Sequence, residues 1–269
     1  MNQKIIELAN SLIKEEWLMQ TKIEWIHLFR QSKAEKSKPL LYNPSIIFIF
    51  NWYKKLYLED NVYEYWKLKY LLVSAPTPVM CETFMENDTP FLWLSIQIDL
   101  NELYNLVRTF ELNWENGNKT RGLSNSNKWI LPLPLNEKIE NCLIRLLEVC
   151  MLDLDSQVLW TSIRNEILFH TIKNEDAKEF CNLVLNSKNF TEFGNILKKI
   201  HIEYDSNFDI ETLAKQMHMS IPTFHRNFKS MTGYSPIQYI KNIRLNKAKV
   251  LLDVEWYSVK EAAQNVWYT

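Results

Sequence analysis

The spacing of apolar and polar positions changes twice along the chain. The first 40 residues carry apolar side chains at mixed helical spacings and then a lysine-rich loop up to Pro39, which predicts a helix and a linker. Between 45 and 98 the apolar residues form short β-branched and aromatic runs, broken by turn residues such as Pro76 and Pro78. Helical spacing returns after 101. The runs that predict strands are 46–52, 69–73 and 91–98, and the later helical segments lie near 101–110, 136–151, 157–172 and 176–186, with polar loops such as 113–127.

The fold class that follows is α+β, with most strands between 45 and 98 and a helical region over 190–269. Several short strands without long helices between them are typical of a small sandwich or barrel. The aromatic residues of these strands suit an apolar ligand pocket and a packed core equally well. They are Phe48, Phe50, Trp52, Tyr53, Phe91 and Trp93.

A weak internal repeat occupies the last 80 residues. Residues 209–220 (DIETLAKQMHMS) align with 258–269 (SVKEAAQNVWYT), offset by 49 positions. Each copy begins with an N-capping residue, Asp209 or Ser258, and the second adds Glu261 at the position of a capping box. Each copy also ends on a hydroxyl residue that can cap a following helix. Two short helices, each followed by a turn and a new cap, are typical of tandem helix-turn-helix units.

The first unit predicts its helices in detail. A helix over 210–217 precedes a turn at 218–219, and Ser220 caps a second helix that runs to about 230. Pro222 falls in the first turn, where its missing N–H costs little. Gly233 suits a left-handed cap at the end of this helix, and a long helix over 237–252 follows.

The two faces of the second helix differ in character. Phe224 and Phe228 are four residues apart and therefore face the core. The outward face carries Pro222, His225, Arg226 and Lys229.

The charge of this region adds to the DNA-binding interpretation. The whole chain has a formal net charge of −1, so it carries no general nucleic-acid signature. Between Lys215 and Lys249, however, there are seven Lys or Arg residues and no Asp or Glu. Phosphate binding needs such a local patch, although a solvated basic face on an ordinary helical domain would have the same composition.

These motifs resemble the DNA-binding domain of the AraC/XylS family of bacterial transcription regulators. The resemblance rests on MSIPTFHRNFK at 219–229, TG at 232–233 and SPIQY at 235–239, with Lys241, Arg244, Leu245, Ala248, Lys249, Leu251 and Leu252. Residues 62–106 resemble the N-terminal domain of one branch of that family. The residues concerned there are Tyr63, Tyr65, KYLLVS at 69–74, Pro78, Val79, Glu82 and PFLWL at 90–94, together with RGL at 121–123, RLL at 145–147 and RNEI at 164–167 in the linking helices.

The resemblance implies a cupin-like β-barrel or sandwich with helices, followed by an all-α helix-turn-helix domain. The expected organisation is an N-terminal helix and linker at 1–44, a β-rich sensor region at 45–110, a helical linker or dimerisation region at 111–189 and the DNA-binding domain at 190–269. The expected partners are double-stranded operator DNA, a small-molecule effector in the N-terminal domain and a second copy of the chain. We expect a cytoplasmic protein.

The family's first recognition helix enters the major groove, and its base-facing positions correspond to Pro222, His225 and Arg226. Arg226 is expected to pair with guanine through two hydrogen bonds, whereas Lys229 and Lys241 are expected to contact phosphate. For Arg244, a DNA contact and a structural salt bridge remain equally open. The full set of predicted DNA-binding residues is Pro222, Thr223, His225, Arg226, Lys229 and Lys241.

The sequence departs from the family pattern in two respects. There are only 4 glycines, and Trp52, Glu59, His218 and Trp267 stand where the family usually has glycine, so strained left-handed backbone is expected at these residues. Thr269 aligns with Ser220, so we expect the second unit to be incomplete and its recognition helix to be absent. We also expect weaker operator binding than a chain with that helix restored, and exposed apolar surface on Ala262, Val266 and Trp267.

Other functional classes find less support. No histidine lies between His27 and His170, and no phosphate loop, catalytic triad or metal motif occurs, so we expect no enzyme activity, no cofactor and no metal. The four cysteines form no CxxC pair and are expected to be buried thiols. The uncharged runs are too short to cross a membrane. The alternative that stays open is a sensor or dimerisation protein with little or no specific DNA binding.

Overall fold

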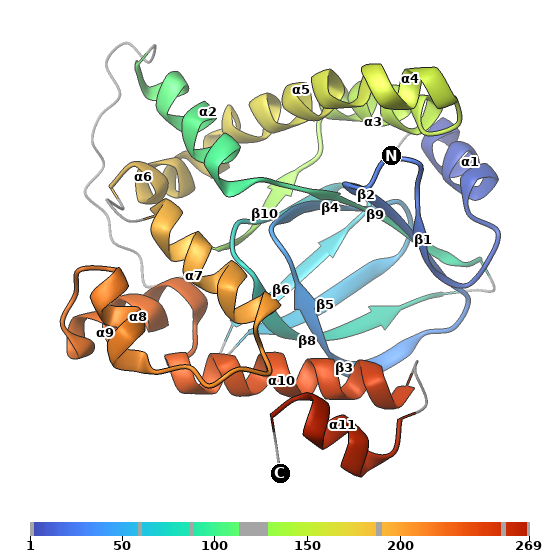
Figure 1. Ribbon diagram of the computed structural model, residues 1–269. Helices are drawn as coiled ribbons and strands as arrows, with labels where there is room; N and C mark the ends of the chain where they lie inside the picture. The colour runs from blue at the N-terminus through green and yellow to red at the C-terminus, as the bar shows by residue number, and fades with distance from the viewer. Residues whose placement is uncertain are drawn as a thin grey trace.

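The computed structural model describes residues 3–58, 61–86, 89–112, 129–186, 190–253 and 257–267. Two antiparallel sheets form a sandwich, and helices cover one of the sheets and the lower edge of the molecule (Figure 1). The larger sheet has the order β1-β2-β9-β4-β7-β10 and the smaller one the order β3-β8-β5-β6. The strands are β1 Trp17–Gln20, β2 Ile26–Gln31, β3 Glu35–Tyr42, β4 Ser45–Ile49, β5 Tyr53–Leu58, β6 Asn61–Trp66, β7 Lys69–Val73, β8 Thr77–Phe84, β9 Phe91–Gln97 and β10 Ile130–Pro134.

The helices divide into two groups. One group comprises the N-terminal helix and the helices before and after β10: α1 Gln3–Leu12, α2 Leu100–Leu112, α3 Glu137–Val149, α4 Asp153–Val158, α5 Trp160–Ile172 and α6 Lys178–Asn186, with a short 3₁₀ turn at Glu175–Ala177. The other group makes up the C-terminal region: α7 Phe190–Ile202, α8 Ile210–Gln216, α9 Ile221–Thr232, α10 Pro236–Asp253 and α11 Val259–Asn265.

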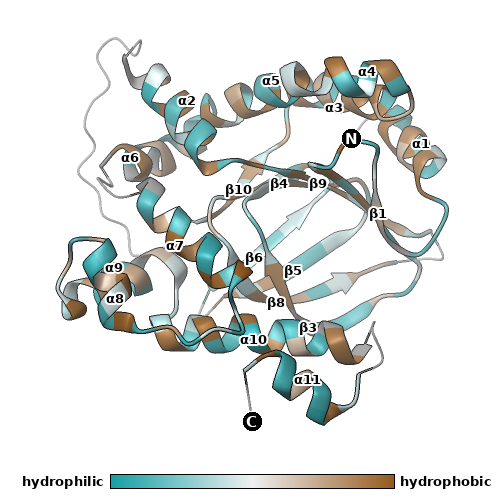
Figure 2. Ribbon diagram, in the orientation of Figure 1, coloured by the Kyte–Doolittle hydropathy of each residue, from teal (hydrophilic) through white to brown (hydrophobic). Residues whose placement is uncertain are grey.

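Two layers of apolar packing hold these parts together. One cluster fills the space between the two sheets and includes Ile47, Leu56, Tyr65 and Phe91. The other lies between the larger sheet and the helices and continues into the C-terminal helices, as the apolar colouring of the strands and inner helix faces in Figure 2 shows. The larger sheet is therefore buried on both faces. This explains why its central strand β4 is apolar at every position after Ser45.

The fold confirms the α+β class, with β-structure early and helices late. Six of the ten strands among the described residues lie between 45 and 98, and β7 has the predicted bounds. The described residues of 190–269 are helical or in turns between helices. All four cysteines are buried and reduced. The polar loop predicted at 113–127 falls outside the described residues.

The helical prediction for the first 40 residues is wrong beyond Leu12. Three strands occupy this segment, and β1 and β2 extend the larger sheet while β3 forms an edge of the smaller one. In β2, Ile26 and Leu28 alternate with less buried residues, so the sheet selects a period of two that the mixed spacing concealed. The helical prediction for 111–189 likewise missed β10, which pairs with β7.

The sequence analysis predicted that Pro78 interrupts a strand, but Pro78 lies within β8. Leu41 of β3 is its register partner, whereas β5 pairs with β8 only from Met80 onward. Pro78 therefore occupies a part of β8 that has a neighbour on one side only, where a missing N–H is tolerated.

Candidate nucleic-acid interface

The first helix-turn-helix unit has the predicted order of caps and helices. The Asp209 carboxylate accepts hydrogen bonds from the backbone N–H groups of Glu211 and Thr212 at 3.2 and 3.0 Å, which starts α8. The Thr212 hydroxyl also donates to this carboxylate at 2.6 Å, and this bond, followed by the two backbone bonds, lowers the pKa of Asp209. Ser220 Oγ accepts from the Thr223 N–H at 3.4 Å and starts α9. The ends of both helices lie within two residues of their predicted positions.

Left-handed backbone occurs where the sequence predicted it. Trp52, His218 and Trp267 have φ values of 59°, 52° and 75°, and they are the positive-φ non-glycine residues of the described chain. Gly233 has φ 84° and caps α9 as expected. Left-handed backbone was also predicted at Glu59, which lies outside the described residues. In the turn between α8 and α9, His218 therefore adopts the left-handed backbone conformation that glycine usually adopts. This conformation costs a non-glycine residue roughly 1–2 kcal/mol of conformational free energy.

Helix α9 is amphipathic, and its polar face is turned to solvent. Phe224 and Phe228 are fully buried, as predicted. Among the predicted DNA-binding residues, Pro222, Arg226 and Lys229 are exposed, and Thr223 and His225 are half-buried. These five residues share one helix, so a single surface presents them together.

The long helix α10 contributes a further cation and a structural arginine. Lys241 is exposed. Arg244 is buried, and it donates hydrogen bonds through Nε to the Tyr204 carbonyl at 2.8 Å and through Nη2 to the Ser206 carbonyl at 2.7 Å. Its guanidinium also lies 4.3 Å from the centre of the Trp267 ring. Arg244 is therefore a structural residue: its hydrogen bonds hold the loop before α8, and its guanidinium packs on the ring of Trp267 after α11.

The second repeat forms the expected capped helix. Ser258 Oγ accepts from the Glu261 N–H at 3.3 Å, and the Glu261 carboxylate accepts from the Ser258 N–H at 2.9 Å, which completes the capping box. The expectation of exposed apolar surface here is wrong for Ala262 and Val266, which are both 1% exposed, and right only for Trp267. The reason is that α11 packs against α10, which covers its apolar face.

The sandwich interior holds a charged residue that the sequence analysis missed. Lys54 on β5 is 3% exposed, and its Nζ lies 4.1 Å from the ring centre of Trp93 and 5.1 Å from that of Phe91. The alternation of β5 could have revealed it, because Lys54 shares a face with Leu56 and Leu58, both fully buried. Phe48 and Phe50, expected in a pocket or a core, belong to the layer between the larger sheet and the helices.

The part of the chain that the structure describes contains neither a metal-binding cluster nor a membrane-spanning helix. No group of three or more His, Cys, Asp or Glu side chains is arranged to hold a metal ion. No described helix has the length and apolar composition that a membrane span requires.

Sequence comparisons match both parts of the molecule. Residues 22–179 match the family described as the AraC-type transcriptional regulator N-terminus, and residues 213–269 match a helix-turn-helix domain family. No curated protein matches the chain.

Among solved structures, ToxT from Vibrio cholerae has a similar fold at low sequence identity. One crystal form of ToxT gives a TM-score of 0.58 at 13% identity, over 91% of this chain and 89% of that chain. ToxT of strain SCE256 bound to an unsaturated fatty acid gives 0.56 at 14% identity, over 96% and 89%. ToxT of strain O395 bound to (E)-4-(8-methylnaphthalen-1-yl)but-3-enoic acid gives 0.57 at 12% identity, over 91% and 89%.

The first family match covers more than half of the chain, and the chain therefore belongs to the AraC-type transcriptional regulators. It is a DNA-binding regulator of transcription with a helix-turn-helix domain, as the sequence predicted, and its family is not one of enzymes.

Proposed function

We propose that this regulator recognises a specific operator sequence through the solvent-facing side of α9. The observation that carries the proposal is the division of α9 into a buried aromatic face and a face with exposed Arg226 and Lys229. Arg226 lies in the middle of the helix and reads a guanine edge through two hydrogen bonds. Lys229, one turn from the end of α9, and Lys241 on α10 neutralise phosphates and set the register. Pro222, Thr223 and His225 contribute further contacts near the start of α9.

The direct test is selection of bound sequences from a random duplex library, followed by mobility-shift titration at several salt concentrations. We expect one enriched sequence, with a binding constant that falls as salt rises because phosphate contacts release counterions. Equal binding to the enriched and scrambled duplexes would contradict sequence-specific recognition and favour a sensor or dimerisation protein.

The effector that we propose is an apolar carboxylic acid bound in the sandwich. Both ToxT ligands named above are carboxylic acids with apolar bodies. In this chain, the ammonium of Lys54 lies among Trp93, Phe91 and the apolar residues between the sheets, which suits a carboxylate with an apolar tail.

Replacing Lys54 with methionine is expected to abolish binding of such an acid while keeping the side chain's length and apolar stem. Oleate should raise the melting temperature of the parent chain, since it stabilises the state that binds it, and should leave Lys54→Met unchanged. The matched control is Lys55→Met, the next residue on β5, whose side chain points outward and pairs with Glu64 at 2.8 Å. Equal oleate shifts in both variants would exclude Lys54 as the carboxylate partner.

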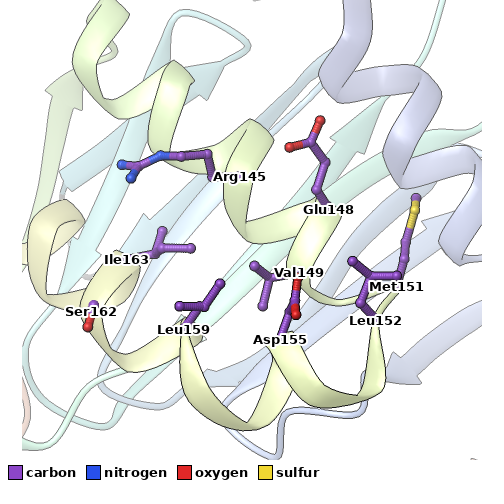
Figure 3. A pocket seen from close by; sticks show the side chains of 9 residues that line it. All are labelled: Arg145, Glu148, Val149, Met151, Leu152, Asp155, Leu159, Ser162 and Ile163. Atoms are coloured by element: carbon purple, nitrogen blue, oxygen red, sulfur yellow. The ribbon is translucent and has the colours of Figure 1, made fainter.

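We further propose that a second copy of the chain binds at α4. Four large apolar side chains in this segment are exposed: Leu152 by 53%, Leu154 by 72%, Val158 by 62% and Leu159 by 46%. Leu152 and Leu159 also line a groove of about 630 Å³ between α3, α4 and α5, together with Val149 and Ile163 (Figure 3). Contiguous apolar surface of this kind usually marks an interaction site.

The occupant that fits this surface is another copy of the same surface. Leu152 and Leu159 line the groove and flank the exposed Leu154, so a two-fold axis that brings the two copies of this segment together would bury the groove and α4 of both protomers. The rim carries both Arg145 and Asp155, so the pairing of two identical surfaces can join opposite charges.

Leu154→Asp is therefore expected to shift the chain from dimer to monomer in sedimentation velocity. Because Leu154 is mostly exposed, the folded protomer should tolerate the substitution. Leu68→Asp, at a residue that is 52% exposed between β6 and β7, is the control and should stay dimeric. A parent chain that is monomeric at micromolar concentration would contradict this interface.

A further inference from the structure

A pair of tyrosines from the DNA-binding region contacts the start of β8 and the residue before it. The Tyr239 hydroxyl donates a hydrogen bond to the Pro76 carbonyl at 2.6 Å, and the Tyr234 hydroxyl donates one to the Pro78 carbonyl at 3.3 Å. Tyr239 is fully buried. Helix α10 also packs against β8 and β3, so these hydrogen bonds lie within a packed contact between the two parts of the chain.

This part of the chain can accept hydrogen bonds but has few to donate. Pro76 and Pro78 have no N–H, and β5 pairs with β8 only from Met80 onward. The backbone carbonyls before Met80 therefore lack partners from β5. The two phenol groups supply donors to this acceptor-rich segment, and burial makes each such bond costly to leave unmade.

The Tyr239 hydroxyl has a second partner in α7. His201 Nε2 lies 3.3 Å from it. Burial, with a smaller contribution from Lys247, lowers the pKa of His201 to about 4, so the imidazole is neutral at physiological pH. Because the single phenol hydrogen is used on Pro76, the neutral imidazole must carry its hydrogen on Nε2 and donate to the Tyr239 oxygen. One hydroxyl thus joins α7, α10 and the segment before β8.

The same tyrosines contact the structure that supports α9. The Tyr239 ring packs edge-on against Phe228, with ring centres 5.3 Å apart. Tyr234 directly follows Gly233, the residue that caps α9, and its N–H donates to Thr232 Oγ1 at 3.2 Å. A displacement of Pro76 or Pro78 would therefore reach α9 through the Phe228 ring and the end of the helix.

On its other side, β8 contacts the sandwich interior. Val79 and Cys81 belong to the cluster between the sheets, and Cys81 Sγ lies 3.5 Å from the Tyr42 hydroxyl. The strand β8, which accepts the Tyr234 hydrogen bond and directly follows Pro76, thus also lines the sandwich interior.

We propose that Tyr234 and Tyr239 are positioning residues that fix the orientation of α9 relative to the sandwich and make that orientation respond to changes at β8. This inference rests on the proposed function only in taking α9 as the helix that reads DNA. The role of the hydrogen bonds from Tyr234 to Pro78 and from Tyr239 to Pro76 can be tested without DNA and without an effector.

The first test measures a distance in the full chain by pulsed electron paramagnetic resonance. Cysteines introduced at Ser230 on α9 and at Leu68 in the sandwich carry the spin labels; both sites are exposed, whereas the native cysteines are buried. The parent should give a narrow distance distribution, and Tyr234→Phe/Tyr239→Phe should broaden or shift it. The exposed Tyr257→Phe is the control and should match the parent. An unchanged distribution in the double variant would overturn the proposal.

The second test asks whether the two tyrosines transmit a change at β8 to α9 or only hold α9 in place. Val79→Ala removes volume from the interior side of β8 and should shift the Ser230–Leu68 distance when both tyrosines are present. In the Tyr234→Phe/Tyr239→Phe background the same substitution should produce no further shift. If Val79→Ala shifts the distance equally in both backgrounds, the tyrosines do not transmit the change. Should the double variant fail to fold by circular dichroism, Tyr234→Phe alone, at a half-buried residue, provides the same comparison.

Discussion

Arg226→Ala is expected to remove most of the preference for one operator over other DNA, whereas Lys229→Ala weakens binding to all duplexes by a similar factor. Arg226 lies on the exposed side of α9 with five guanidinium donors available, and a bidentate contact with guanine contributes about 1–3 kcal/mol of discrimination. Lys229 has the position of a phosphate contact, which carries no sequence information.

The measurement is a titration of each variant with the selected operator and with a scrambled duplex, at one salt concentration and then across a salt series. Lys229→Ala should also reduce the steepness of the salt dependence, since one fewer counterion is released, while Arg226→Lys tests whether charge alone suffices. Lys260→Ala, at an exposed residue of α11, serves as a charge-matched control. If Arg226→Ala and Lys229→Ala reduced specific and non-specific binding by one common factor, the two roles would be wrongly assigned.

Phe228→Ala is expected to lower the free energy of unfolding of the C-terminal region by about 3–5 kcal/mol, because it leaves a cavity that the surrounding rings cannot fill. Phe228 is fully buried, and its ring centre lies 5.2, 5.3 and 5.5 Å from those of Phe193, Tyr239 and Phe224. It thus joins α9 to both α7 and α10. Loss of this contact removes the support of α9, so operator binding should be lost as well.

Urea unfolding followed by circular dichroism measures the stability change. Ile221→Ala is the control within the same helix, because Ile221 is 43% exposed and its truncation leaves no cavity. The expected change there is below about 0.5 kcal/mol, as for most surface substitutions. A stability loss of that small size in Phe228→Ala would show that the α9 interface is not closely packed.

The sequence predicted the local structure of the helix-turn-helix region well, because capping and turn chemistry act over a few residues. Asp209, Ser220 and Ser258 cap helices as their side chains indicated. His218 and Trp267 adopt the left-handed backbone that their aligned positions required. The separation of α9 into an apolar and a basic face also follows from a spacing of four residues, which the helix itself imposes.

The β-structure could be predicted only in part. Strand β7 is apolar and β-branched enough to identify from its own residues, whereas β1, β2 and β3 depend on partners elsewhere in the chain. The pairing of β2 with β9 joins residues 60 to 70 positions apart, and no local pattern records it. For the same reason the sequence did not reveal that Arg244 is held by the carbonyls of Tyr204 and Ser206.

The sequence by itself thus determined the class of protein, the capped helices of its DNA-binding region and the residues on the solvent face of α9, since these depend on short-range spacing and side-chain chemistry. Only the tertiary structure decided which residues meet across long distances in the chain. It placed Lys54 among the aromatic rings of the sandwich, Tyr239 against Pro76, and the exposed Leu152 and Leu159 in the lining of a groove. Contacts of this kind arise from the burial of surfaces that come together only on folding, so they leave no periodic signal along the chain.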